Sequence, residues 1–157
     1  MTEVENEKTR NDYLREEFDD SLFTKMKWEG RQTDGVLQWF AQFVNKTSFR
    51  VPMTLTVGGN LISGEMISEE AYFEQLAANF SGALPEENRD TGKKLIQMLL
   101  PVHDADSEER PVCQFIHMQE TRVFADPGKP IISSGVLWRG KISSVDGFSL
   151  VSLSVTQ

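Results

Sequence analysis

The residues of this chain with the clearest capacity for chemistry are its one cysteine and its two histidines. A catalytic thiol needs a base within hydrogen-bonding distance. Cys113 and His117 are four residues apart in a segment that reads as a strand, so they share a face but lie about 13 Å apart at ~3.3 Å per residue. This separation excludes direct proton transfer between them. A small apolar side chain in the core is the better interpretation of Cys113.

The second histidine, His103, begins the acidic run HDADSEERP at 103–111. A structural metal site needs three or four convergent ligands, and here the other histidine belongs to a different element. The run also lacks the ligand spacing and the turn glycine of an EF-hand. We therefore interpret 103–111 as a solvated loop and expect neither a metal nor a cofactor. No Gly-x-Ser-x-Gly nucleophile motif occurs either, so the sequence predicts a protein that is not an enzyme.

Composition narrows the classes of partner. The chain has 157 residues, a net charge of −8 and a pI near 4.8, and its lysines and arginines are scattered. Nucleic acids and anionic membrane surfaces both attract clustered positive charge. We therefore expect no nucleic acid or membrane partner. One cysteine, the lack of a secretory signal and the lack of an apolar run of roughly 18 residues predict a soluble, cytoplasmic protein.

The first 33 residues differ in composition from the rest. They are rich in acidic residues and poor in branched apolar ones, which is typical of a segment that remains flexible. Apolar residues nevertheless recur every four positions, as on one face of a helix. Both interpretations stay open: an acidic flexible tail, or a helix that docks on a partner or on this domain. The predicted partner-binding residues are Leu14, Phe18, Leu22, Phe23, Met26 and Trp28.

The segment 34–46 has the pattern of an amphipathic helix. Apolar residues follow one another at i, i+3, i+4, i+7 and i+8, and they are Val36, Trp39, Phe40, Phe43 and Val44. Thr33 or Asp34 is a suitable N-cap, because its side-chain oxygen can accept from an unpaired backbone N–H. We predict that Trp39 and Phe40 lie in the core.

Two strands and two helices are expected next. Alternating residues predict strands over 51–57 and 61–67, joined at Gly58-Gly59-Asn60 by a tight turn, with Gly64 marking a bulge or bend. Ser68 is the N-cap of a helix that ends near Gly82 and buries Tyr72, Phe73, Leu76 and Phe80. A third helix is predicted between Pro85 and Pro101.

Three more strands follow the acidic loop. The first covers 112–124 and ends at the turn 126–128; the second covers 135–144, with Trp138 on its core face. Asp146-Gly147 is a strong hairpin signal. The last strand covers 148–155, and its alternation shifts at Leu150-Val151, which predicts a bulge.

The order of elements predicts one α+β domain over 34–157. We expect a small, antiparallel, strongly bent five-stranded sheet, with an N-terminal helix and a helical insertion between strands 2 and 3. A helix followed by five bent strands resembles the Sm-like small barrel, and Arg139-Gly140 with Ile142 is similar to the Arg-Gly step of its fourth strand. An open sheet is the alternative. Exposed sheet edges favour a homodimer or a larger ring.

A family resemblance adds what the residues alone leave open. FIHMQETRVF followed by VLWRGKISSVDGFSL is similar to the C-terminal half of the gas vesicle protein U family, which are bacterial accessory proteins. The upstream pieces LQWFAQFVNK, MTLTVGGNLISGEMIS and EEAYFEQL come in that family's order. Together these pieces lie within 34–150.

The resemblance implies a non-catalytic accessory protein that assists or regulates gas vesicle assembly. Its partners would be shell components or other accessory proteins, bound in a chaperone-like way in a bacterial cytoplasm, at or near the vesicle. Two other classes stay open: an Sm-like RNA-binding oligomer and a small-ligand-binding barrel. A basic rim and salt-dependent binding would mark the RNA-binding class.

Overall fold

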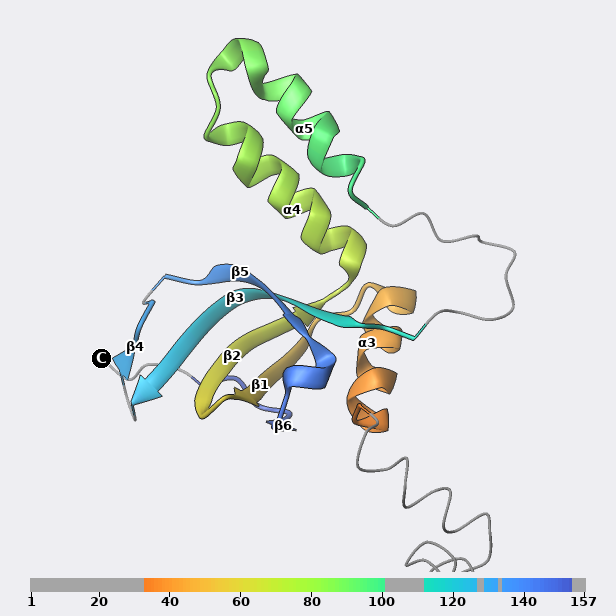
Figure 1. The fold of residues 1–157 in the computed structure, drawn as a ribbon, viewed down its shortest axis with the longest axis vertical. Helices are drawn as coiled ribbons and strands as arrows, with labels where there is room; N and C mark the ends of the chain where they lie inside the picture. Colours follow the sequence, from red (N-terminus) through yellow and green to blue (C-terminus); the bar gives the residue numbers. More distant parts are fainter. Residues whose placement is uncertain (1–32, 101–111, 127–128, 133, 154–157) are drawn as a thin grey trace, which may run out of the picture. The chain divides into compact units, whose positions relative to one another are not determined.

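We describe a computed structural model of the chain over residues 33–100, 112–126, 129–132 and 134–153 (Figure 1). The predictions for 1–32, for His103 and its acidic loop, for the turn residues 127–128 and for the end of the last strand lie outside these ranges. The division into a segment 1–33 and a domain 34–157 therefore stays a prediction.

Helix α3, Gly35–Thr47, follows the cap that the sequence predicted. Oδ1 of Asp34 accepts from the backbone N–H of Val36 at 2.8 Å and of Leu37 at 3.1 Å. The helix ends where Ser48 takes a left-handed conformation with φ 57°. A side-chain oxygen at the N-cap satisfies N–H groups that have no partner inside the helix. The predicted helix is confirmed.

The prediction that Trp39 lies in the core is wrong. Its side chain is 56% exposed, whereas Leu37, Ala41 and Val44 form the buried face of α3. Phe40 is half-buried and packs against the core. The helix carries two apolar rows, and only one of them can face the sheet.

Strands β1, Val51–Val57, and β2, Asn60–Ile67, form the expected hairpin. The turn residues Gly58 and Gly59 have φ values of +55° and +81°. Only glycine adopts such values without steric cost, so a tight turn forms at this pair.

The predicted bulge lies at Gly64, and its extra residue belongs to the next strand, β3, Phe115–Asp126. β3 places Glu120 and Thr121 opposite the single residue Gly64, and Glu120 takes a φ of 48°. A Cβ at Gly64 would lie 2.7 Å from the carbonyl oxygen of Gln119. The bulge therefore depends on the missing side chain.

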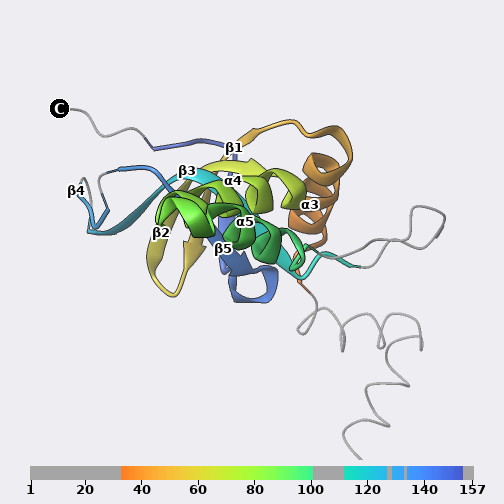
Figure 2. The same cartoon turned by 90° about the horizontal axis from the view of Figure 1, so that it is seen from above.

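The helical insertion between β2 and β3 is confirmed, and it consists of α4, Glu69–Gly82, the 3-10 turn η1, Glu86–Asn88, and α5, Arg89–Gln97. Oγ of Ser68 accepts from the N–H of Ala71 at 3.1 Å, as the sequence predicted. Phe80 is partly exposed rather than buried. Seen from above, α4 and α5 lie side by side (Figure 2).

The sheet is antiparallel, and the described residues contain six strands rather than the predicted five. The order is β4-β3-β2-β1-β6, and β5 also pairs with β3. The additional strand is β4, Lys129–Pro130, which pairs with the end of β3, while β5, Val136–Lys141, pairs with its beginning. The α+β class is confirmed. The interruption between β4 and β5 explains the different count.

The predicted hairpin at Asp146-Gly147 is wrong. A 3-10 turn, η2, Ile142–Ser144, carries the chain from β5 to β6, Gly147–Ser149, which pairs with β1 instead of β5. Asp146 instead supports the Gly58 turn, because its Oδ2 accepts from the N–H of Gly58 at 2.9 Å. Since β5 and β6 are not paired in the described part of the chain, the sheet is open and the Sm-like barrel is not confirmed.

The last strand is shorter than predicted. Pairing with β1 ends at Ser149, and residues 150–153 leave the ladder. Side chains then replace the lost backbone partners: the hydroxyl of Thr54 donates to the carbonyl of Val151 at 2.6 Å, and Oγ of Ser63 accepts from the N–H of Leu153 at 2.7 Å. The chain therefore crosses β1 and β2 as a strap rather than as a bulged strand.

Two hydrophobic clusters lie on opposite faces of the sheet, because successive residues of a strand point to opposite sides. Met66 belongs to the main cluster beneath α3, whereas its neighbour Ile67 belongs to a smaller cluster with Tyr72 and Phe73 of α4. Leu137 of β5 packs against this second cluster. The α4–α5 hairpin is thus attached to the sheet through the first turns of α4 (Figure 1).

Candidate functional site

A buried histidine, paired with an arginine, lies where α4 meets the sheet. His117 of β3 is buried, and it pairs in register with Arg139 of β5. Nε of Arg139 donates to Nε2 of His117 at 3.1 Å. An imidazole nitrogen that accepts must be unprotonated, so the neutral ring carries its hydrogen on Nδ1.

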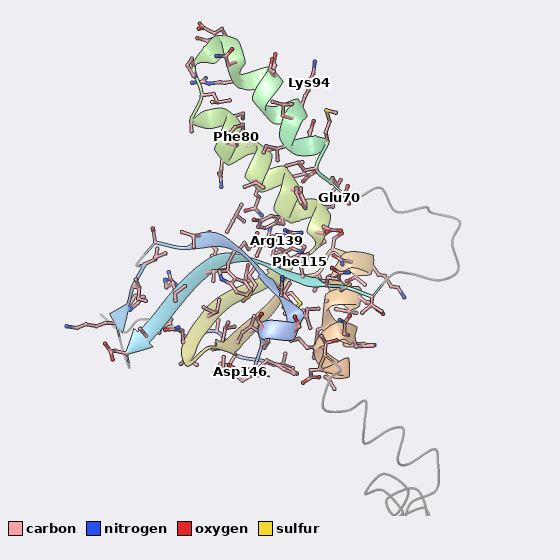
Figure 3. All side chains as sticks on the ribbon, viewed as in Figure 1. Glu70, Phe80, Lys94, Phe115, Arg139 and Asp146 are labelled. Carbon is pink, nitrogen blue, oxygen red and sulfur yellow. The ribbon has the colours of Figure 1, made fainter. Side chains whose placement is uncertain are left out.

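Aromatic rings enclose this pair. The His117 ring lies 4.8 Å from the ring of Tyr72 and 6.2 Å from that of Phe73, measured between centroids. Cζ of Arg139 lies 3.7 Å from the ring centroid of Phe115, which is a close cation–π contact. Figure 3 shows Arg139 and Phe115 at the base of the hairpin.

Burial lowers the pKa of His117 from 6.5 to about 4. The nearby Glu69 raises this pKa, and the positive charge of Arg139 lowers it further. A general base works best with a pKa near the working pH, and the acceptor nitrogen of His117 already has a partner. The arrangement positions the α4–α5 hairpin. It does not resemble a catalytic pair.

Cys113 does not form a reactive centre with His117. Burial raises the pKa of its thiol, which lowers the fraction of the nucleophilic thiolate. Nδ2 of Asn45 donates to its Sγ at 3.7 Å, and the residue is half-buried against the main core. The interpretation of Cys113 as a small core residue agrees with this environment.

Over the described residues, no three histidine, cysteine, aspartate or glutamate side chains converge on a possible metal position. A shallow crevice between α3, the end of β2 and the beginning of β3 encloses essentially no volume, so it is too small for the ligands that occupy small-molecule pockets. None of the helices in the described ranges is long and apolar enough to cross a bilayer.

The six predicted partner-binding residues, from Leu14 to Trp28, lie outside the described ranges and stay predictions. Sequence reasoning missed a different surface. On α3 the exposed ring of Trp39 stacks on that of Phe43, which is half-buried against the main cluster, with centroids 5.2 Å apart and planes 13° apart. Phe49 lies 5.8 Å from Phe43.

The sequence did contain a signal for this surface. Leu37, Ala41 and Val44 already form an i, i+4, i+7 row that is sufficient to cover the sheet. Val36 and Trp39 therefore belong to a second row, which has no partner within the described part of the chain. A second apolar row on a helix of 13 residues indicates a further contact.

A second exposed apolar surface lies on the hairpin. Leu95, Met98 and Leu99 have exposed fractions of 55%, 79% and 63%. Ile96 and Leu100 turn inward to the smaller cluster. Because the apolar residues alternate between two sides, one side of the α5 end has no cover from the part of the chain that the structure describes.

Comparison with known proteins finds one family. A model of the family described as gas vesicle protein GvpU-like matches residues 34–153, which is most of the chain. No curated protein and no solved structure matches significantly.

Proposed function

Since this chain belongs to the GvpU-like gas vesicle protein family, we propose that it is a non-catalytic accessory protein of gas vesicle assembly. It assists or regulates assembly by direct contacts with shell components, in a bacterial cytoplasm or on the vesicle itself. Family membership supports this role.

The observation that carries the proposal is the exposed apolar end of the hairpin. Leu95, Met98 and Leu99 lie together on α5 and just beyond it. A group of large apolar side chains exposed together on a charged protein marks an interaction site. Lys93 and Lys94 come directly before them and keep this end hydrated. A holding factor for apolar shell subunits needs such a surface.

The segment 1–33 supplies a second contact in this proposal. Leu14, Phe18 and Leu22 have the spacing of anchors on an amphipathic helix. Each buried anchor contributes about 1.5–3 kcal/mol before the cost of ordering the segment is subtracted. The acidic residues between them prevent this segment from associating indiscriminately.

Self-association is also part of the proposal. Among the described strands, β5 pairs only with β3, and β6 pairs only with β1. Each therefore presents one unpaired edge, and such edges favour pairing with another chain. Edge pairing would give a homodimer or a larger ring.

Replacing the apolar end of the hairpin should weaken binding to shell protein. We expect the triple variant Leu95→Ser, Met98→Ser, Leu99→Ser to bind purified shell protein at least tenfold more weakly in a co-sedimentation assay. The side chains are exposed, so the melting temperature should change little. Ile131→Ser, at an exposed site outside the hairpin, is the matched control. Equal binding by the triple variant and the control would refute the role of the hairpin.

Deleting residues 2–33 should separate recognition from folding. The remaining domain contains both hydrophobic clusters, so we expect nearly unchanged thermal unfolding together with weaker shell binding. A collapsed fold would show that the segment is part of the core. Undiminished binding would place recognition entirely within 34–157. If the intact protein did not bind shell protein, the proposed function itself would be wrong.

A further inference from the structure

The exposed row on α3 has the spacing of a helix-pairing surface. We define the α3 seam as Val36, Trp39, Phe43 and Lys46, which follow one another at intervals of three, four and three residues. This is the a/d spacing by which two helices interlock. Val36 is 57% exposed, and Trp39 is more than half exposed.

The seam is held in a defined conformation although Val36 and Trp39 are exposed. Phe43 is half-buried against the main cluster. The ring of Trp39 stacks on Phe43 and meets Phe40 edge to face at 5.1 Å. Phe40 in turn contacts Phe148 of β6 at 6.1 Å, so the aromatic row is anchored to the sheet. Preorganised aromatic side chains lose little entropy when a partner covers them, and such side chains dominate binding energies at interfaces.

We propose that a second copy of this chain covers the α3 seam, with the two α3 helices antiparallel about a two-fold axis. The seam is symmetric about Ala41. In an antiparallel pair Trp39 therefore lies opposite Phe43 of the other copy, and Val36 lies opposite Lys46. A two-fold contact requires the same surface on both copies, and the seam meets this requirement.

The charges at the two ends of α3 select the antiparallel orientation and the second copy as occupant. Asp34 lies at the beginning of the helix, and Lys46 lies in its last turn. Antiparallel pairing brings the basic end of each copy beside Asp34 of the other, and it also opposes the two helix dipoles. The stem of Lys46 can cover Val36 while its ammonium group reaches that carboxylate. A parallel pair would place like charges together.

This contact is separate from the sheet edges. All four seam residues lie on α3, and β6 supports them only through the contact of Phe148 with Phe40. The inference also concerns the purified chain alone. A failure of the α3 dimer proposal would say nothing about binding to shell protein. A failure of shell binding would not contradict the α3 dimer.

Cysteine cross-linking tests the geometry directly. In the full chain carrying Cys113→Ser, we expect Val36→Cys combined with Lys46→Cys to form a covalent dimer with oxidised glutathione. Within one copy these positions are ten residues apart, about 15 Å along a helix, and too far for an internal disulfide. The matched control is Glu70→Cys with Phe80→Cys, the same interval on α4 (Figure 3). Equal cross-linking of both pairs, or efficient cross-linking by Val36→Cys alone, would overturn the proposal.

A measurement without cysteines covers the case in which the variant misfolds. Trp39→Ser should raise the dimer dissociation constant at least tenfold in sedimentation equilibrium, while its circular dichroism spectrum stays that of the intact chain. Val112→Ser, which replaces another exposed residue outside the seam, should leave that constant unchanged. Undiminished association of Trp39→Ser would show that the seam is not the dimer contact.

Discussion

Replacing Leu37 by alanine is expected to lower the free energy of unfolding by about 2–5 kcal/mol. The side chain is 0% exposed and belongs to the main cluster between α3 and the sheet. Truncation removes buried methyl groups and leaves a cavity that the packed strands cannot fill. Since a domain of this size is stable by only about 5–15 kcal/mol, urea unfolding at neutral pH should show a large shift of the midpoint.

Val36→Ala is the matched control for this experiment. It is the preceding residue of the same helix, and its side chain is more than half exposed. The stability of the monomer should change by less than about 1 kcal/mol, as is usual for surface positions. Equal losses at the two positions would contradict the orientation of α3 on the sheet.

Acidification should destabilise the domain through His117. Its pKa is lowered to about 4 in the folded chain, whereas an unfolded histidine has a pKa near 6.5. Between these values the unfolded chain binds a proton that the folded chain does not bind. The contribution of His117 to stability is therefore complete above about pH 6.5 and is lost as the pH falls towards 4, by about 3 kcal/mol.

The variant His117→Phe isolates this contribution from that of the carboxylates. It is expected to be less stable than the intact chain at pH 7, because the Nε–H of Arg139 loses its acceptor. The difference in unfolding free energy between the two chains should shrink as the pH falls from 6.5 to 4. A difference that stays constant over this range would contradict a neutral, buried His117.

The local features of the fold could be predicted from the sequence because their causes lie within a few residues. The carboxylate of Asp34 caps α3 by accepting from the backbone N–H groups of Val36 and Leu37. Gly58-Gly59 determines a tight turn, because both residues take positive φ values. These two signals do not depend on distant parts of the chain. Gly64 also indicated the bulge, because a missing Cβ permits close approach of backbone, but the extra residue belongs to the distant strand β3.

The pairing of strands that are distant in the sequence could not be predicted from such local signals. Asp146-Gly147 has the composition of a hairpin turn, yet burial of Ile142 in η2 directs the chain across the sheet, and β6 pairs with β1. Strand composition does not identify the partner of a strand, because the choice depends on what the whole sheet can bury. The extra strand β4 was missed for this reason as well.

The candidate sites also combine features that the sequence predicted with features that only the tertiary structure decided. The sequence predicted His117 as a strand residue, and it lies in β3, whereas Cys113 lies before that strand begins. The pairing of His117 with Arg139 and its enclosure by Tyr72 and Phe73 depend on β5 and α4, which are distant in the chain. Likewise, the sequence by itself determined that α3 is amphipathic, whereas only packing on the sheet decided which row it buries. Because Leu37, Ala41 and Val44 fill that contact, Trp39 is left at the surface.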